Sequence, residues 1–151
     1  MDIQKKMPSV ALGTWSWGTG AVGGDQVFGN RLGENELREV FDTAMKEGLN
    51  LWDSAVVYGM GASEDILGAF ARTCRREELI LSTKFTPQIA QEVEDPMALM
   101  CAGSLERLGT DYIDIYWIHN PADVEKWTPY LIPLVKSGKV KRVGVSNHNL
   151  A

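Results

Sequence analysis

Four residues of types suited to proton transfer occupy related places in the sequence. Asp53, Lys84 and His119 each stand at or directly after the end of an apolar segment, and Tyr58 follows Asp53 by five positions. Buried ionisable side chains cost desolvation energy unless they are paired, so stability alone does not explain three of them on successive segments. A lysine ammonium stabilises a nearby phenolate, an aspartate keeps that lysine charged and oriented, and a neutral histidine donates a hydrogen bond to a substrate oxygen. The set therefore predicts Tyr58 as a general acid that protonates an oxygen atom.

Each of these residues also has a purely structural interpretation. A lone carboxylate such as Asp53 often caps a helix, Tyr58 could be a packed loop aromatic, and His119 could be a satisfied core histidine. Ser146 and Asn147 follow the last apolar segment, and both are common loop residues. The spacing of the four ionisable residues together favours the catalytic interpretation.

Alternating strand and helix patterns would position these residues. The predicted strands comprise 10–12, 49–53, 79–83, 112–118 and 140–145, and the predicted helices comprise 35–47, 63–73, 95–108 and 124–136. The last helix is expected to be short or kinked because it contains Pro129 and Pro133. Such alternation is typical of βαβ units and a parallel sheet, either a doubly wound open sheet or an eight-stranded barrel. In a barrel, the polar residues at the strand ends all converge on one face.

A glycine-rich stretch between the first strand and the first helix matches a nucleotide-binding pattern. Gly18-Thr19-Gly20-Ala21-Val22-Gly23 has the form G-x-G-x-x-G, which requires a helix to begin inside the motif. The following residues 24–30 are not typical of a helix, and the next helix is predicted to begin at residue 35. We therefore interpret 18–33 as a flexible loop beside an active site.

Composition excludes several classes of protein. The net charge is −5, which argues against a nucleic-acid-binding protein, and the four basic residues between Lys136 and Arg142 are expected to form a solvated turn. No apolar run approaches the roughly 18 residues that span a bilayer, and the amino terminus does not resemble a signal peptide. We therefore expect a cytoplasmic protein that does not contact membranes. Cys74 and Cys101, both in helix-like segments, lack metal-ligand spacing, so we expect reduced thiols and no metal site.

Several motifs resemble those of the aldo-keto reductase family, in the same order and spacing over essentially the whole chain. They are Asp53-Ser54-Ala55-Val56-Val57-Tyr58-Gly59 continuing through Ser63-Glu64 to Leu67-Gly68, Ser82-Thr83-Lys84, Ser104-Leu105-x-Arg107-Leu108-Gly109-x-Asp111-Tyr112-x-Asp114, Ile118-His119-Asn120-Pro121, and Gly144-Val145-Ser146-Asn147. The resemblance implies a parallel (β/α)8 TIM-type barrel, of which residues 1–151 would be a single domain forming the first half. It also implies NADPH as hydride donor and an aldehyde or ketone as the small-molecule substrate.

The resemblance further assigns roles to individual residues. Asp53, Tyr58, Lys84 and His119 match a catalytic tetrad in which Tyr58 protonates the carbonyl oxygen. Gly13, Thr14 and Trp15, together with Asp53, match the segments that line the cofactor and substrate site, and Ser146 and Asn147 match the positions that hold the nicotinamide carboxamide. Four tryptophans, which could equally pack in the core, hint at an apolar or aromatic substrate: Trp15, Trp17, Trp52 and Trp117.

Family members are about twice as long as this chain, in keeping with the usual size of the barrel. The segment that grips the pyrophosphate and 2′-phosphate would belong to the second half, so we expect weak or no activity from this part alone. The first and fifth strands would be open edges, which invite self-association. A truncated protein, a closed dimer and a proteolytic remnant are all compatible with the sequence. The alternative function is a non-catalytic NADP(H)-binding regulatory subunit that senses redox state.

Overall fold

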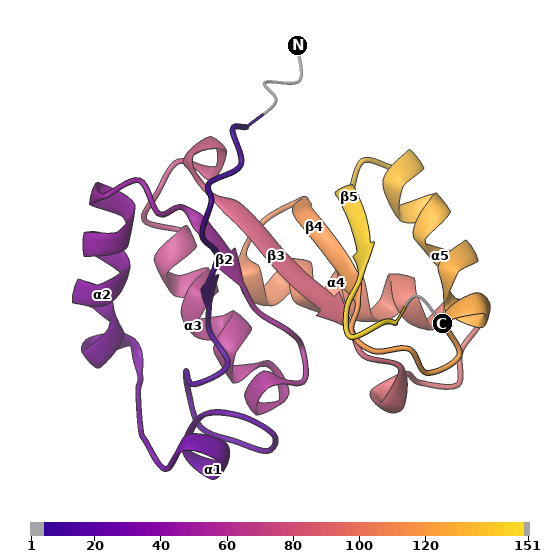
Figure 1. Cartoon of the computed structure of the whole chain (residues 1–151), viewed down its shortest axis with the longest axis horizontal. Coiled ribbons are helices and arrows are strands. Elements are labelled where there is room, and N and C mark those ends of the chain that lie inside the picture. The colour runs from indigo at the N-terminus through magenta and orange to yellow at the C-terminus, as the bar shows by residue number, and fades with distance from the viewer. Residues whose placement is uncertain (1–4, 150–151) are drawn as a thin grey trace.

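One parallel sheet of five strands forms the centre of the computed structural model, which describes residues 5–149 (Figure 1). The strands are β1 (Leu12–Gly13), β2 (Leu51–Asp53), β3 (Ile80–Phe85), β4 (Ile113–Ile118) and β5 (Val140–Val145). Each strand pairs with the next one along the chain. This sequential order fits the first half of a (β/α)8 barrel, whereas the strand order of a doubly wound sheet reverses at a switch point.

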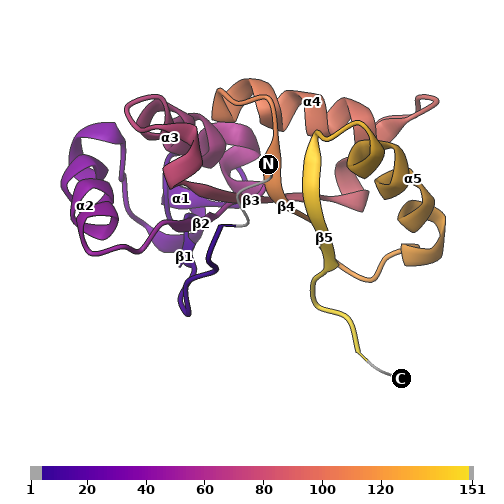
Figure 2. The same ribbon diagram turned by 90° about the horizontal axis from the view of Figure 1, so that it is seen from above.

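The helices lie along the outer face of this curved sheet and leave its inner face uncovered (Figure 2). They are α2 (Glu34–Lys46), α3 (Ala62–Ala71), α4 (Pro96–Leu108) and α5 (Val124–Lys136), with the short α1 (Gly24–Phe28) and the 3-10 turns η1 (Tyr58–Gly61), η2 (Arg76–Glu78) and η3 (Pro87–Ile89) between them. None of the helices within residues 5–149 is long and apolar enough to cross a membrane.

The two faces of the sheet differ because successive side chains along a strand point in opposite directions. Side chains that face the helices form the core, in which Trp52 stacks on Phe41 and packs against Trp17. A second part of the core joins β4 to α4 and α5. Trp17 and Trp52 are therefore core residues, and they do not contribute to a substrate pocket.

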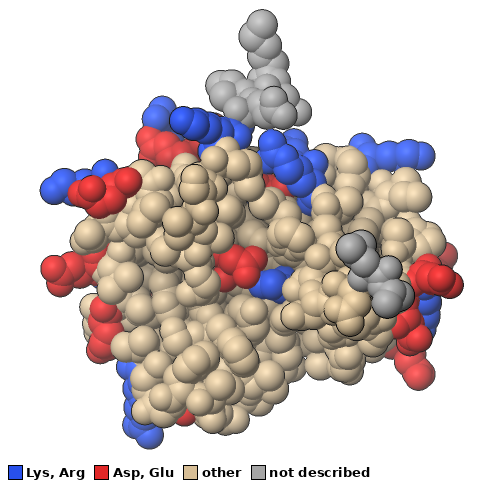
Figure 3. Space-filling model, in the orientation of Figure 1, with Lys and Arg blue, Asp and Glu red and all other residues tan. Residues whose placement is uncertain are grey.

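The inner face lines an open hollow of about 360 Å³. Its walls come from residues of all five strands, the residue before β1 and the residue after β5: Ala11, Gly13, Leu51, Asp53, Ser82, Lys84, Ile115, Trp117, Val145 and Ser146. Figure 3, which looks onto this face, shows an acidic and a basic group side by side at its centre, surrounded by uncharged surface. The polar residues of the carboxyl strand ends thus converge on the inside, as the sequence predicted.

The prediction that residues 24–30 are not helical is wrong. Gly24–Phe28 forms the single turn α1, capped by a left-handed Gly29 whose N–H bonds to the Asp25 carbonyl. The Asp25 carboxylate also accepts the N–H of Gly20 at 2.9 Å. Because Val27 and Phe28 remain largely exposed, the turn has no periodic apolar pattern from which it could have been predicted.

The last helix has the predicted bounds, and its prolines do not shorten it. Helix α5 runs for 13 residues across Pro129 and Pro133. An interior proline costs about 3 kcal/mol of helix stability. The buried side chains of Trp127, Leu131 and Leu134 on the core-facing side of α5 offset that cost.

Three smaller differences concern boundaries. β1 lies at Leu12–Gly13 rather than at 10–12, and β3 extends to Phe85, which places Lys84 inside the strand. Cys74 lies in the turn after α3, whereas Cys101 is in α4 as expected. Both cysteines are free, and burial raises the pKa of the Cys101 thiol to about 12.

Candidate active site

The ammonium group of Lys84 is the centre of a hydrogen-bonded cluster at the carboxyl end of the sheet. Lys84 Nζ donates to Asp53 Oδ2 at 2.5 Å and to the Ser54 carbonyl at 2.7 Å. Its distance to Tyr58 Oη is 3.4 Å. The side chain of Lys84 is 7% exposed and that of Asp53 29% exposed, so the pair lies at the edge of the hollow. Three of the four predicted catalytic residues are thus in direct contact.

The backbone around Tyr58 explains the glycine-rich loop. Tyr58 begins η1, where Gly59 and Met60 both have positive φ angles, 59° and 52°. A Cβ atom at Gly20 would lie 2.8 Å from the Gly59 carbonyl oxygen, and one at Gly23 would lie 2.6 Å from the Gly59 amide nitrogen. The glycines of the G-x-G-x-x-G pattern therefore allow its backbone to pack closely against the loop that carries Tyr58. The loop lies beside the site, as predicted.

Trp15 forms one wall beside the tyrosine. Its ring stacks on Tyr58 with centroids 5.7 Å apart and meets the edge of Phe28 at 5.3 Å. The indole N–H donates to the Val22 carbonyl at 2.8 Å, which fixes the ring against the glycine-rich loop. With 43% of its surface exposed, Trp15 leaves an apolar surface open to solvent beside the Tyr58 ring.

His119, the fourth predicted catalytic residue, lies directly after β4 and meets Tyr58 edge to face with ring centroids 5.7 Å apart. Its Nδ1 lies 3.1 Å from Thr86 Oγ1. Burial lowers the pKa of His119, and the nearby Lys84 charge lowers it further, while Asp53 acts in the opposite direction. The imidazole is therefore neutral at neutral pH.

Thr14 and two serines attach the first strand to this cluster. The buried Thr14 donates its backbone N–H to the Asp53 carbonyl at 3.0 Å. Ser63, in α3, donates to Thr14 and lies 3.2 Å from Ser54 Oγ. These contacts fix the backbone on both sides of the Asp53 carboxylate.

The predicted cofactor-binding residues at the ends of β1 and β5 face the same space. Gly13 and Ser146 line the hollow. The Asn147 amide donates to the His119 carbonyl at 2.9 Å and to Ser146 Oγ at 3.1 Å. The described residues therefore bring all the predicted site residues to one end of the sheet, although the amide hydrogens of Asn147 already have partners within the chain.

Two residues of this site, Ser82 and Thr86, were not predicted individually, whereas Trp117 was among the tryptophans proposed for a pocket and does line the hollow. Ser82 Oγ donates to Asp53 Oδ1 at 2.6 Å and accepts the Trp117 indole N–H at 2.8 Å, and Thr86 contacts His119. Ser82 could have been found from its spacing, because a polar residue two positions before Lys84 shares its face of the strand. No comparable signal pointed to Thr86.

A second cluster, which we call the amino-end cluster, lies at the opposite end of the strands and comprises Lys5, Arg76, Tyr112 and Asp114. Asp114 accepts from Lys5 at 2.9 Å, from Arg76 at 2.6 Å and from the Leu81 amide at 2.9 Å. The Arg76 guanidinium stacks on the Tyr112 ring at 3.8 Å, and Lys5 donates to Tyr112 Oη at 3.1 Å.

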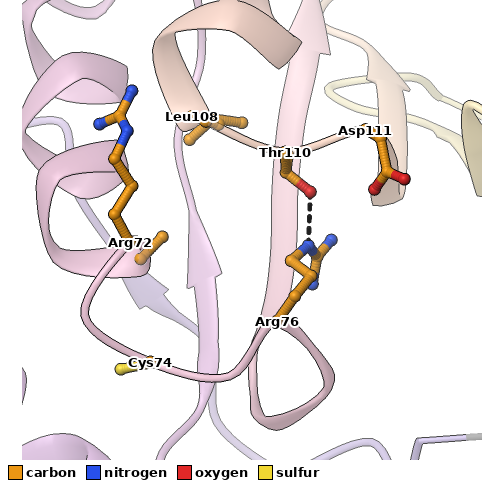
Figure 4. Close-up of a pocket in the computed structure, with 8 residues that line it drawn as sticks. Arg72, Cys74, Arg76, Leu108, Thr110 and Asp111 are labelled. Carbon is orange, nitrogen blue, oxygen red and sulfur yellow. Dashed lines mark hydrogen bonds between the residues drawn. The ribbon is translucent and has the colours of Figure 1, made fainter.

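An open hollow of about 450 Å³ adjoins this cluster (Figure 4). Arg76 Nε donates to Thr110 Oγ1 across it at 2.7 Å, and the other Arg76 donors bond to the Leu79 and Tyr112 carbonyls and to Asp114. Arg72 donates to the carbonyls at the carboxyl end of α4. The arginines of this hollow are thus bonded within the chain and serve the fold.

Comparison with known proteins identifies the family. The aldo/keto reductase family model matches residues 9–151. Aldo-keto reductase str7 of Strobilurus tenacellus is 37% identical over 141 residues, which cover 89% of this chain and 41% of that protein. Aldo-keto reductase YhdN of Bacillus subtilis is 33% identical over 159 residues, covering 93% of this chain and 44% of that protein. The chain spans less than half the length of these curated relatives.

Solved structures give the same result. The aldo/keto reductase from Klebsiella pneumoniae in complex with NADP and acetate has a TM-score of 0.78 and 30% identity, covering 95% of this chain and 47% of that one. An aldo-keto reductase from Klebsiella pneumoniae in complex with NADPH has a TM-score of 0.77, also at 30% identity, covering 95% and 46%. The family model, the sheet order and these neighbours agree with the sequence motifs, and the chain belongs to the aldo/keto reductase family.

Proposed function

We propose that this chain carries the proton-donor site of an oxidoreductase that reduces an aldehyde or ketone to an alcohol with NADPH. The observation that supports it most is the position of Lys84 Nζ between the Asp53 carboxylate and the Tyr58 hydroxyl, within hydrogen-bond distance of both. Carbonyl reduction requires a group that protonates the oxygen as the carbon accepts a hydride, and this cluster is such a group.

Lys84 acts through its charge. Its ammonium group is held by Asp53 and the Ser54 carbonyl, which leaves one hydrogen directed towards Tyr58 Oη. As the hydroxyl proton of Tyr58 moves to the carbonyl oxygen, the ammonium group stabilises the phenolate that remains. Asp53 keeps Lys84 oriented and charged during this step.

His119 orients the substrate oxygen. When Nδ1 accepts the hydroxyl hydrogen of Thr86, the neutral imidazole carries its own hydrogen on Nε2. That N–H donates to the carbonyl oxygen and directs it towards Tyr58. A neutral histidine fits this role because its ring does not repel the Lys84 ammonium.

The residues at the mouth of the hollow fit the nicotinamide end of NADPH. Gly13 leaves one wall free of side-chain atoms, and the Ser146 hydroxyl and Asn147 amide oxygen offer the polar partners that a carboxamide needs. When bound, NADPH supplies the hydride. Within the chain, Asp53, Ser146 and Asn147 would hold and orient it.

The exposed ring of Trp15 suggests the substrate class. It stacks on the Tyr58 ring and meets Phe28 edge to face, so the three rings form one aromatic cluster. We therefore propose that the substrate carries an apolar or aromatic group next to its carbonyl. Trp15→Ala should raise KM for benzaldehyde more than KM for a short aliphatic aldehyde; an equal rise for both would contradict this assignment.

The test of the proposed function is Tyr58→Phe, which removes the hydroxyl and keeps the ring. Loss of the acid should lower kcat for aldehyde-dependent NADPH oxidation by about 10²- to 10⁴-fold. NADPH binding, followed by fluorescence, should remain. The control is Tyr130→Phe on α5, whose ring packs against Trp127. NADPH binding without turnover, unchanged by Tyr58→Phe, would instead indicate a regulatory NADP(H)-binding subunit.

A further inference from the structure

A chain of hydrogen bonds runs across the inner face of the sheet from β4 to β2. Trp117 Nε1 donates to Ser82 Oγ at 2.8 Å, and Ser82 Oγ donates to Asp53 Oδ1 at 2.6 Å. The other carboxylate oxygen, Oδ2, accepts from Lys84. All four residues line the hollow of the candidate active site.

The chemistry of the three groups fixes the direction of this chain. An indole N–H is a donor and has no acceptor atom, so Ser82 Oγ must accept from Trp117. The hydroxyl hydrogen of Ser82 is then free to point at Asp53, which as a carboxylate accepts it. Trp117 thereby orients a hydroxyl that would otherwise rotate, and Ser82 fixes one edge of the Asp53 carboxylate.

Gly144 allows the indole to take up this position. Trp117 and Gly144 are paired across β4 and β5, and the six-membered part of the indole lies against the Gly144 backbone. A Cβ atom at position 144 would lie 2.3 Å from Trp117 Cζ3 and 2.4 Å from Cε3, closer than any side chain tolerates. A glycine at this point in β5 thus provides the space for a ring that reaches Ser82.

We infer that Ser82 and Trp117 are positioning residues of the proton-donor site, acting through Asp53 on Lys84. This inference rests on the proposed function. The separation of 3.4 Å between Lys84 Nζ and Tyr58 Oη is at the long end of the hydrogen-bond range. Rotation of the Asp53 carboxylate would draw Lys84 away from Tyr58. A fixed carboxylate therefore keeps the Lys84 ammonium close enough to stabilise the Tyr58 phenolate.

The two residues are tested by Ser82→Ala and Trp117→Phe in this protein. Each variant should lower kcat by about three- to tenfold, the effect of one hydrogen bond, and change KM for the aldehyde less than kcat. The double variant should lose no more than either single one, because both changes interrupt the same chain. Ser104→Ala and Trp127→Phe are matched controls, since their buried hydroxyl and indole N–H have no partner among the described residues.

A spectroscopic readout makes the result independent of turnover. In a 1H–15N spectrum of the indole groups, Ser82→Ala should shift the Trp117 Nε1–H signal and speed its exchange with solvent, while the Trp127 signal stays in place. An unmoved Trp117 signal would overturn the hydrogen-bond chain itself. A moved signal with kcat equal to that of the controls, in a protein that Tyr58→Phe inactivates, would overturn the positioning role. Full activity of Tyr58→Phe would overturn the proposed function and this inference with it.

Discussion

An aspartate, a lysine and a tyrosine meet at both ends of the sheet, but with different surroundings. At the amino end, Asp114 accepts from Lys5, Arg76 and a backbone amide, and its side chain is 5% exposed. At the carboxyl end, Asp53 and Lys84 border an open hollow, and Lys84 is the group within hydrogen-bond distance of the Tyr58 hydroxyl.

The difference shows what separates a chemical site from a structural one in this fold. The amino-end cluster satisfies its donors and acceptors within the chain, and cations stack on the Tyr112 ring. In the carboxyl-end cluster, the Tyr58 hydroxyl has one long contact, to Lys84 Nζ, and lies beside the neutral His119 and the open hollow. Residue types alone do not distinguish the two clusters, whereas the position of the Tyr58 hydroxyl beside an open hollow does.

The largest expected contrast comes from replacing each lysine with methionine. Lys84→Met should lower kcat by about 10²- to 10⁴-fold, because the phenolate loses its counter-charge. Lys5→Met should leave kcat unchanged and lower stability, because it removes one of the cations that balance Asp114. Steady-state kinetics and thermal unfolding of both variants test the contrast, which equal losses of kcat in the two proteins would refute.

Replacing the aspartates should affect stability more at the amino end than at the carboxyl end. Asp114→Asn leaves Lys5 and Arg76 without their shared carboxylate in a nearly dry setting, so we expect a loss of about 3 kcal/mol in the free energy of unfolding. Asp53→Asn should cost less, because Asp53 is 29% exposed and the Lys84 ammonium keeps the Ser54 carbonyl as an acceptor. Urea unfolding measures both values; a larger loss for Asp53→Asn would invert the comparison.

Removal of the tyrosine hydroxyl gives a smaller effect at the amino end. Tyr112→Phe loses one hydrogen bond from Lys5 and keeps the ring that Arg76 stacks on, so stability should fall by about 1 kcal/mol with kcat intact. Urea unfolding and kinetics of this variant are compared with those of Tyr58→Phe. A loss of turnover in Tyr112→Phe would mean that the two ends are coupled.

The smallest effect concerns pH. Burial and the Lys84 charge lower the pKa of His119 below its value of about 6.5 in an unfolded chain. Between these two values the unfolded state binds more protons, so stability falls as pH drops below about 6.5 and levels off below the pKa of the folded state. An NMR titration of the His119 ring, assigned with His119→Gln, should give a midpoint below 6.5 that rises in Lys84→Met. A midpoint at or above 6.5 would contradict the prediction.

The sequence was most informative where one pattern recurs from strand to strand. Apolar runs broken by glycine predicted all five strands within a few residues, and the polar residue at each strand end predicted Asp53, Lys84 and His119 as neighbours. Spacing alone could not give the contacts across strands, because register depends on the whole sheet. Ser82 and Trp117 are far apart in sequence and meet because β3 and β4 align Lys84 with Trp117.

Two departures from helix propensity, the prolines within α5 and the unpredicted turn α1, have a common physical cause. Helix α5 tolerates its prolines because its core-facing side chains pack on the sheet, and α1 forms because Asp25 and Gly29 close a single turn. In both cases tertiary contacts and local hydrogen bonds outweigh the propensity of the residues. The same limit applies to the G-x-G-x-x-G pattern, whose glycines could be explained once their neighbours at Tyr58 and Gly59 were known.

The contact between Trp117 and Gly144 also constrains how this protein can evolve. No residue larger than glycine fits at position 144 while the indole is present, so a lineage that gains a side chain there must first exchange the tryptophan for a smaller residue. The two positions should therefore vary together among relatives, with glycine at 144 wherever tryptophan stands at 117. Relatives with smaller residues at 117 are free to carry a side chain at 144, and they must orient their aspartate by other means.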